Sequence, residues 1–448
     1  MSAVPAIPSL DQEPVPQRPD APRSPENLDD VGLAPDAVRD LMLKALYVQG
    51  SRTGQELAEY VCLPFGLVDE ELLTLQQRRF IEVRGTTGPN RASYRFDLGA
   101  EGRARAKDAL EASQYVGPVP VPLSQYRAWI AAQSIRHAHV TQQVMRDGFD
   151  HLVLDEELFE MLGPAVNSSK SIFLYGHPGN GKTAIAEAVS KMLGGSLYIP
   201  YAVDIDGQIM TVFDGVHHQE IEPEGGYPDD KGIWLRTGSS YDRRYALIKR
   251  PVVVTGGELS MEQLDLQYDP FTKLYQAPFQ VKANGGVLIV DDFGRQRVPP
   301  RDLLNRWIVP LEKRVDYLTL HTGGKFPIPF DCLLIFATNL DPADLVEEAF
   351  LRRIHYKISV DNPSKEGYEE IFRRCCDGLG IAFEPAALAQ IYRDFYDGMN
   401  IPARACHPRD ILSHVCDIAK YRETKPRLTR DLVDMACRSY FLSNAQDH

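Results

Sequence analysis

Residues 171–192 read SIFLYGHPGNGKTAIAEAVSKM, and this stretch decides the fold of the second half of the chain. Ser171–Tyr175 is a short apolar run that is typical of a buried strand. Gly176–Thr183 follows the pattern GxxxxGKT, and apolar residues at helical spacing come directly after it. A strand, a glycine-rich loop and a helix in this order are the context that a phosphate-binding loop requires. The sequence therefore predicts an α/β domain that binds a polyphosphate.

The residue types in this loop explain the chemistry. Glycines let the backbone N–H groups turn toward a polyphosphate, and the following helix adds its positive N-terminal end. We expect Lys182 to reach the β- and γ-phosphates and the hydroxyl of Thr183 to bind Mg²⁺. The residues expected to contact the nucleotide are Gly176, His177, Pro178, Gly179, Asn180, Gly181, Lys182, Thr183 and Ala184.

Two further apolar runs end in polar residues. Val287–Val290 is followed by Asp291 and Asp292, at the carboxyl end of a strand, where doubly wound sheets bind their ligands. We expect Asp291 to be a second partner of Mg²⁺ and Asp292 to orient an attacking water. Asn339 follows the run Cys332–Ala337, and its amide is expected to polarise the same water or to contact the γ-phosphate.

Arginines complete the candidate site. Arg352 and Arg353 precede an apolar strand, and their place in the order suggests that they are offered to a neighbouring subunit's nucleotide. Arg409 lies in the first turn of a helix expected from His407, where a lid could touch phosphate. The candidate catalytic residues are therefore Lys182, Asp292, Asn339, Arg352, Arg353 and Arg409.

Taken in this order, the elements resemble the AAA+ ATPases over about residues 125–448. The resemblance implies ATP with Mg²⁺, an α/β core over 125–360 with a five-stranded parallel sheet, a helical lid over 361–448, and a ring that is usually a hexamer. The family's named roles fall as follows: Walker A on Gly176–Thr183, Walker B on Asp291 and Asp292, sensor 1 on Asn339, the arginine finger on Arg352 or Arg353, and sensor 2 on Arg409. The helix expected over Asp302–Arg314, with the later Pro329-Phe330-Asp331 and the Ala-Thr-Asn end, looks like the MoxR-like branch and its helix-2-insert relatives.

Two features depart from the family pattern. Asp292 stands where glutamate is usual and is one methylene shorter, so hydrolysis could be slow. Lys182 and Asp291 are also unusually far apart, and the excess lies around residues 205–284. Within it, Tyr245–Thr255 is expected to form a strand pair or hairpin arm. Phe213 is the candidate for an aromatic residue that grips a polypeptide, with ordinary packing as the favoured alternative. His217 and His218 belong to an acidic loop for which we favour solvation over metal binding.

The first third of the chain is organised differently. Residues 1–32 carry seven prolines and are expected to be a disordered tail. Residues 33–114 read helix–helix–helix–strand–loop–strand–helix, with a capping box at Thr53 and Glu56, and this order resembles a small α+β winged-helix domain. Residues 115–124 alternate valine and proline, as expected of a stiff linker.

Winged helices often bind DNA through their third helix. Here that helix begins with Asp69, Glu70 and Glu71, which would repel phosphates, while Arg78 and Arg79 lie at its far end. Residues 33–113 carry eleven Lys/Arg and twelve Asp/Glu. Protein contact or a structural role is therefore favoured over DNA binding, which stays open.

Composition limits the classes of function. The chain of 448 residues has a net charge of −13 and 44% hydrophobic residues, which excludes a wholly disordered chain and argues against one that depends mainly on nucleic-acid phosphates. No apolar run is long enough to span a membrane, no secretory signal is present, and the seven cysteines lack CxxC spacing, so we expect a cytoplasmic protein. Three hypotheses follow: an oligomeric ATPase that remodels a protein client, an ATP-controlled DNA-binding regulator, and a nucleotide-gated scaffold that hydrolyses little.

Overall fold

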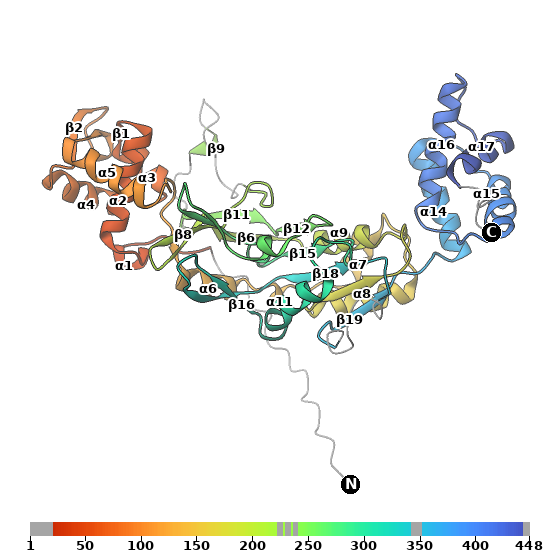
Figure 1. Cartoon of the computed structure of the whole chain (residues 1–448). Helices are drawn as coiled ribbons and strands as arrows, with labels where there is room; N and C mark the ends of the chain where they lie inside the picture. Colours follow the sequence, from red (N-terminus) through yellow and green to blue (C-terminus); the bar gives the residue numbers. More distant parts are fainter. Residues whose placement is uncertain (1–20, 222–226, 229–233, 236–240, 342–351, 442–448) are drawn as a thin grey trace, which may run out of the picture.

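A computed structural model describes residues 21–221, 227–228, 234–235, 241–341 and 352–441. Three parts follow one another along the chain (Figure 1): a small N-terminal domain, a central α/β part and a C-terminal group of helices. Residues 1–20 of the expected tail lie outside the described residues.

The central part is built on a parallel sheet of five strands. All four strand pairs run parallel, and the strand that precedes the phosphate loop, β5, lies between β18 and β19. The order across the sheet is β12 (Val252–Thr255), β15 (Val287–Val290), β18 (Leu333–Ala337), β5 (Ile172–Tyr175) and β19 (Tyr356–Ser359). The carboxyl ends of β5, β15 and β18 therefore meet at one edge, as the sequence predicted.

Helices cover both faces of this sheet because its strands alternate their side chains. Ile172 and Leu174 belong to one core and Phe173 to the other, and all three are buried. The first core also takes residues from α7 (Gln142–Phe149), α8 (Glu156–Asn167) and α9 (Lys182–Met192). The second takes residues from α11 (Pro300–Lys313), with α10 (Phe279–Lys282) and the 3-10 helix η3 (Met261–Leu264) beside it.

Two more groups of strands come from residues between α9 and β15, and one of them also includes a strand at residues 121–122. β6 (Ser196–Pro200) pairs with β11 (Tyr245–Lys249), and a mixed sheet has the order β13 (Gln267–Asp269), β14 (Leu274–Gln276), β8 (Gln208–Thr211), β7 (Ala202–Ile205), β4 (Val121–Pro122). The prediction of a strand pair or hairpin arm over 245–255 is wrong, because β11 pairs with β6 and β12 pairs with β15. Short hairpins are formed by β9 (Tyr227–Pro228) with β10 (Trp234–Leu235), and by β16 (Val315–Thr319) with β17 (Lys325–Pro329).

The N-terminal domain has the predicted helices and strands in the predicted order, with a short additional strand and a 3-10 helix that were not predicted. Thr53 and Glu56 form the expected capping box at the start of the second helix. The elements are α2 (Pro35–Gln49), β1 (Arg52–Thr53), α3 (Gly54–Val61), α4 (Phe65–Gln77), β2 (Ile81–Thr86), the 3-10 helix η1 (Arg91–Ser93), β3 (Tyr94–Leu98) and α5 (Ala100–Ala112). The three strands form one antiparallel sheet in the order β1-β3-β2.

The acids at the start of α4 differ from the expectation. Glu71 is buried and pairs with Arg39, and Asp69 pairs with Arg91 over 2.7 Å. Both carboxylates are therefore neutralised inside the domain instead of facing solvent as a repulsive cluster.

The expected linker is packed rather than exposed. β4 pairs with β7, and the Val119 N–H donates to the Val61 carbonyl oxygen over 2.9 Å. The Gln114 N–H donates to the carbonyl oxygen of Thr272 in the β13–β14 turn, also over 2.9 Å. The N-terminal domain is thus attached to the mixed sheet by these backbone hydrogen bonds. The chain then continues into the α/β part through α6 (Leu123–Ala132) and the 3-10 helix η2 (Ile135–His137).

Part of the expected tail is folded. Residues 28–31 form the helical turn α1 (Leu28–Val31), which has a capping box, and Arg23 bridges to Tyr241. The guanidinium of Arg244 donates to the Val31 carbonyl oxygen over 2.8 Å. The expected boundary at residue 32 is therefore wrong, because specific long-range contacts hold a segment whose composition favours disorder.

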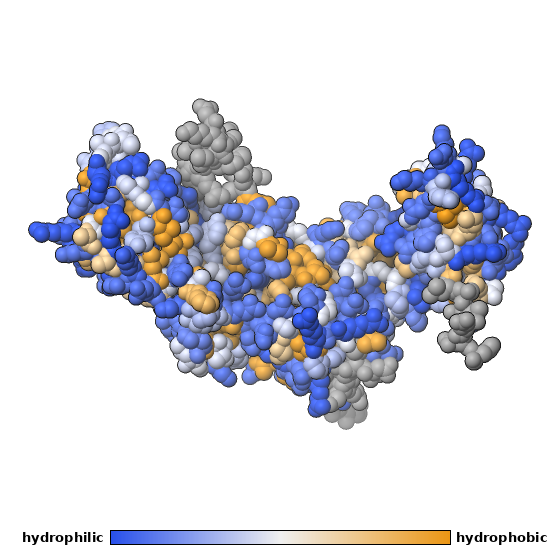
Figure 2. Space-filling view, turned by 45° about the horizontal axis from the view of Figure 1, so that its top comes forward, coloured by the Kyte–Doolittle hydropathy of each residue, from blue (hydrophilic) through white to orange (hydrophobic). Residues whose placement is uncertain are grey.

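The C-terminal helices, called the lid below, are α14 (Lys365–Leu379), α15 (Pro385–Ile391), the π-helical turn η4 (Tyr392–Asp397), α16 (His407–Tyr421) and α17 (Arg430–Tyr440). They share a core of their own. Hydrophilic residues cover most of the lid in the space-filling view (Figure 2). Among the described residues, no helix is both long and apolar enough to cross a membrane.

Candidate functional site

The phosphate loop opens into a cavity of about 600 Å³ at the carboxyl edge of the parallel sheet. Residues from the loop, from the ends of β15 and β18, from the lid and from the segment before α8 all line it. The lining includes Gly179–Ile185, Asp291, Asp292, Ala337–Asn339, His151–Leu154, Ile371, Arg374, Cys375, Ala405, Cys406 and Arg409. The structure therefore brings together residues that the sequence predicted separately.

The loop has the backbone that its glycines allow. Gly176, Gly179 and Gly181 have φ angles of +133°, +87° and +84°, which residues with a Cβ rarely adopt. Gly181 caps the N-terminus of α9, and Lys182 is the first residue of that helix. Gly176, His177 and Pro178 shape the loop but lie outside the lining of the cavity.

Lys182 is held over the loop. Its Nζ donates to the carbonyl oxygens of Gly176 and His177 over 2.9 and 2.8 Å, and the residue is 7% exposed. Burial lowers the pKa of Lys182, and the nearby carboxylates of Asp291 and Asp292 oppose that shift. The ammonium is thus a preorganised cation beside the loop.

Thr183 and the two acids form a connected polar group. The Thr183 hydroxyl donates to Oδ2 of Asp291 over 2.8 Å, and Nδ2 of Asn339 donates to Oδ1 of Asp292 over 3.2 Å. Asp292 has a φ of +48°, a conformation that Asp tolerates better than Glu. A hydroxyl beside a carboxylate is a donor set that suits Mg²⁺, so Thr183 and Asp291 fit the predicted metal site.

Arg409 lines the cavity from the lid. It lies in the first turn of α16, which begins at His407 as predicted, and its Nε donates to Oδ1 of Asp410 over 3.1 Å. The side chain is 77% exposed, so it can turn toward a ligand in the cavity.

Arg352 and Arg353 lie elsewhere. They line a separate cavity of about 710 Å³, together with Arg136, Lys170 and Arg314. The hydroxyl of Ser171, at the start of β5, contacts the Arg353 carbonyl oxygen, whereas the phosphate loop follows the other end of this strand. A four-residue strand is about 13 Å long, so these arginines do not converge on the first cavity.

Sequence reasoning missed the apolar side of the cavity. Leu152–Leu154, Ile371 and Cys375 form an apolar wall beside the loop, with His151 next to it, and burial raises the pKa of the Cys375 thiol. Arg374, on α14 beside these residues, donates a hydrogen bond to the Asp150 carbonyl oxygen and so connects the lid to the segment before α8. Apolar residues carry no local signal of a binding role, either in the segment before α8 or on α14, so only the fold could reveal them.

The remaining predicted residues have structural surroundings. Phe213 packs against Tyr201 and His218, with ring centroids 5.2 and 5.8 Å apart. The expectation of a solvated loop is wrong for His218, which is buried because its Nδ1 accepts from the Asp214 N–H and its Nε2 contacts the Lys282 carbonyl oxygen. No cluster of three or more potential metal ligands occurs among the described residues.

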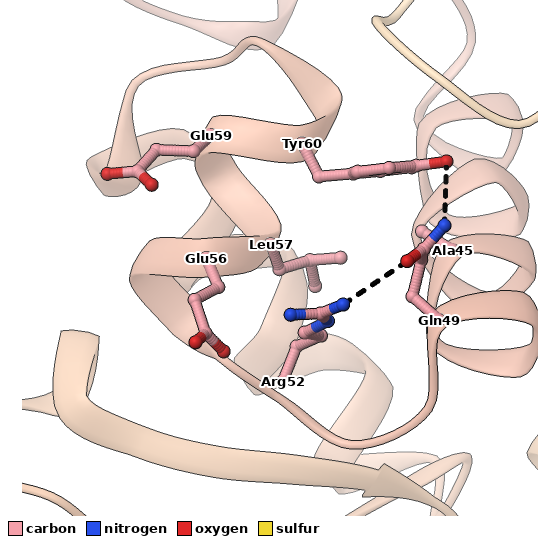
Figure 3. Close-up of a pocket in the computed structure, with 7 residues that line it drawn as sticks. All are labelled: Ala45, Gln49, Arg52, Glu56, Leu57, Glu59 and Tyr60. Carbon is pink, nitrogen blue, oxygen red and sulfur yellow. Dashed lines mark hydrogen bonds between the residues drawn. The ribbon is translucent and has the colours of Figure 1, made fainter. Parts of the chain in front are cut away.

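A smaller cavity of about 330 Å³ lies in the N-terminal domain (Figure 3). Gln49 bridges it, accepting from Arg52 over 3.2 Å and donating to the Tyr60 hydroxyl over 3.4 Å. Glu56 on its rim caps α3. These polar groups hold α2 and α3 together, so the cavity has a structural explanation.

Residues 364–439, which cover the lid helices, match a domain family of unknown function, DUF8689. No curated protein matches the chain. Similar solved structures include RuvB from Thermotoga maritima, described as a Holliday junction branch migration motor, with 14% identity, coverage of 68% of this chain and 72% of that one, and a TM-score of 0.35.

A second similar structure is NtrX from Brucella abortus in complex with ATP. It has 14% identity and a TM-score of 0.38, and the match covers 65% of this chain and 59% of NtrX. With identities and TM-scores this low, neither likeness carries an argument about this chain. Its function is therefore argued from the residues of its own cavity.

Proposed function

We propose that the chain is a Mg²⁺-dependent ATPase of the AAA+ type, whose oligomer couples hydrolysis to the remodelling of a protein partner. One observation carries this proposal: the phosphate loop, Asp291, Asp292, Asn339 and the lid residue Arg409 all line one cavity at the carboxyl edge of a parallel sheet. Phosphate-binding and water-orienting groups in one place are what hydrolysis of a nucleoside triphosphate requires.

Each residue of the cavity has a separate role in the proposed in-line attack of water on the γ-phosphate. Backbone N–H groups of the loop and Lys182 hold the phosphates, and Thr183 and Asp291 would hold Mg²⁺, which supplies charge neutralisation at the phosphate oxygens. Asp292 orients the water with Asn339 beside it, and Arg409 closes the site from the lid. Leu152–Leu154 and Ile371 offer an apolar wall against which the base would pack.

The position of Arg352 and Arg353 supports sharing of sites between subunits. Their cavity lies toward the amino end of β5, so they serve the γ-phosphate of a neighbouring copy rather than their own. A ring, with a hexamer as the expected size, is the closed arrangement in which each copy both offers and receives such arginines. The MoxR-like branch remains the proposed subgroup, and the cytoplasm the proposed location.

The N-terminal domain, proposed to be a winged helix, would recruit the protein partner. Ion pairs within the domain engage six of its nine arginines, which leaves few cations for DNA phosphates. The pairs are Arg39–Glu71, Arg78–Asp36, Arg84–Asp97, Arg91–Asp69, Arg103–Asp97 and Arg105–Asp40. DNA binding is therefore the less favoured role.

The test is ATP turnover per subunit with Mg²⁺ over a wide range of protein concentration. Turnover per subunit is expected to rise with concentration, and the double variant Arg352→Ala/Arg353→Ala is expected to lose at least about a hundredfold in kcat. Arg84→Ala, an exposed arginine of the N-terminal domain, is the matched control and is expected to hydrolyse normally.

A scaffold that binds ATP and scarcely hydrolyses it is the second candidate, because Asp292 is one methylene shorter than glutamate. Tight ATP binding with negligible turnover at every concentration would favour this candidate. Absence of ATP binding to the wild-type chain would refute both.

A further inference from the structure

Asn180 stands in the middle of the phosphate loop and lines the cavity, yet its side chain makes its hydrogen bonds to residues outside the loop. It is 6% exposed, and its Nδ2 donates to the Val360 carbonyl oxygen over 3.2 Å and to Oδ1 of Asn362 over 3.0 Å. Its Oδ1 accepts from the Ala405 N–H over 3.4 Å. The amide therefore uses both donor hydrogens and its acceptor on residues outside the loop.

These partners belong to the segment that joins the core to the lid and to a loop within the lid. Val360 and Asn362 lie between β19 and α14, where the chain leaves the sheet for the lid. Ala405 comes two residues before α16, the helix that carries Arg409. One buried side chain thus connects the phosphate loop with the entrance to the lid and with its arginine-bearing helix.

Close packing reinforces this connection. The Cys406 N–H donates to the Gly179 carbonyl oxygen over 2.9 Å. A Cβ on Gly179 would lie 2.5 Å from Cys406 Sγ, and one on Gly176 would lie 2.5 Å from the Val360 carbonyl oxygen. The loop therefore has no free space on this side, and a change in its position displaces the residues that it touches.

We infer that Asn180 is a positioning residue that couples the phosphate loop to the lid, so that a nucleotide bound at the loop sets the position of Arg409. The inference rests on the proposed function in one respect, namely that the loop binds a nucleotide. A polyphosphate acts on the backbone N–H groups of Gly179–Lys182, and the same stretch holds the lid through Asn180. Binding energy at the loop can therefore select one lid position.

The coupling predicts a split between binding and turnover. Asn180→Ala leaves the loop backbone, Lys182 and Thr183 in place, so the affinity for ADP carrying a fluorescent methylanthraniloyl label should stay within about threefold of wild type. The kcat for ATP should fall by about tenfold or more, because Arg409 is no longer held at a defined distance from the phosphates.

Amide hydrogen exchange of the full-length chain, with and without ADP and Mg²⁺, measures whether nucleotide binding at the loop protects the lid. In the wild type, ADP should protect residues 404–412, and in Asn180→Ala this protection should disappear. Asn167→Ala is the matched control. Asn167 also makes two side-chain hydrogen bonds, but both are to the backbone of Val140, which belongs neither to the phosphate loop nor to the lid. It should keep normal turnover and normal protection of 404–412.

Asn362→Ala is a second, milder variant in case Asn180→Ala does not fold. Asn362 lies outside the lining of the cavity, so its replacement changes no residue that faces the nucleotide. It removes one of the three contacts and should lower kcat about threefold with partial loss of protection. Wild-type protection of 404–412 in Asn180→Ala overturns the inference while the proposed ATPase stands. If Asn180→Ala does not fold or bind ADP, wild-type protection in Asn362→Ala overturns it instead. A wild-type chain that binds no ADP refutes the proposed function itself.

Discussion

The hydroxyl of Thr183 donates a hydrogen bond to Oδ2 of Asp291 over 2.8 Å, although the two residues are 108 positions apart. Thr183 follows β5 and Asp291 follows β15, and β18 lies between these strands in the sheet. Helix α9 therefore brings the hydroxyl across one intervening strand to reach the carboxylate. The contact defines where a divalent cation would be held.

The first prediction concerns this pair. Thr183→Ala removes the hydroxyl and should weaken ATP binding in the presence of Mg²⁺ by about 10–100-fold, as loss of a metal-holding group typically does. Thr183→Ser keeps the hydroxyl and should bind nearly as well as wild type. Titrations with Mg²⁺ and with excess chelator measure the effect. Equal losses for both variants in both conditions would contradict a role for the hydroxyl at the metal.

The second prediction concerns Asp292. Asp292→Asn removes the charge that orients the water but keeps the size, so kcat should fall by at least about a hundredfold. Asp292→Glu extends the reach of the carboxylate and should raise kcat several-fold. Because residue 292 has a φ of +48°, the glutamate should also cost about 1 kcal/mol of stability. Undiminished turnover in Asp292→Asn would rule out this water-orienting role.

Local patterns predicted much of the candidate site because its polar residues come directly after the carboxyl ends of strands. The contact between Asn339 and Asp292 was foreseeable, since the carboxyl ends of parallel strands meet at one edge. The contact between Asn180 and Ala405 was not, because the two residues are 225 positions apart and neither belongs to a pattern that points to the other.

The errors have a similar cause. Residues 245–255 contain two strands, but local alternation does not tell which sheet each strand joins. Residues 21–31 have the composition of a tail, and contacts with residues more than two hundred positions away, among them Arg244 and Tyr241, explain why they are folded. Composition describes the average behaviour of a segment, whereas a single buried partner can reverse it.

The third prediction is a pH dependence of the lid. His407 is 5% exposed, and its Nδ1 lies 3.0 Å from the Tyr396 hydroxyl. Burial lowers the pKa of His407 to about 4 from 6.5; Arg404 adds to this shift and Asp410 opposes it. Between pH 6.5 and 4 the unfolded chain therefore binds a proton that the folded lid does not, and the free energy of unfolding falls as the pH falls.

Hydrogen exchange of the lid helices at pH 7 and pH 5 measures this loss. His407→Asn keeps an acceptor for Tyr396 but cannot be protonated, so it should lower stability at pH 7 while flattening the dependence between the two pH values. The same change at His414, a half-buried residue of α16, should leave the dependence intact. A lid that loses the same stability at pH 5 in His407→Asn and in wild type would assign the effect to other groups.

The last prediction concerns the ion pair that fastens residues 21–31. Arg244 and Asp242 have side chains only 2% and 4% exposed, and their nearest charged atoms are 2.7 Å apart. The same guanidinium donates to the Val31 carbonyl oxygen and to Oε1 of Gln125. Arg244→Met leaves the Asp242 carboxylate buried without its cation, which should cost about 3–5 kcal/mol and release α1 to proteolysis.

The double variant Arg244→Met/Asp242→Leu separates charge from packing. Because it removes both charges, it should recover much of the stability lost in Arg244→Met, as measured by thermal unfolding. It should not restore protection of α1, since the bond to the Val31 carbonyl oxygen stays broken. Recovery of both stability and protection would mean that packing alone holds residues 21–31. No recovery of stability would mean that the cost lies in the lost hydrogen bonds to Val31 and Gln125 rather than in the stranded carboxylate.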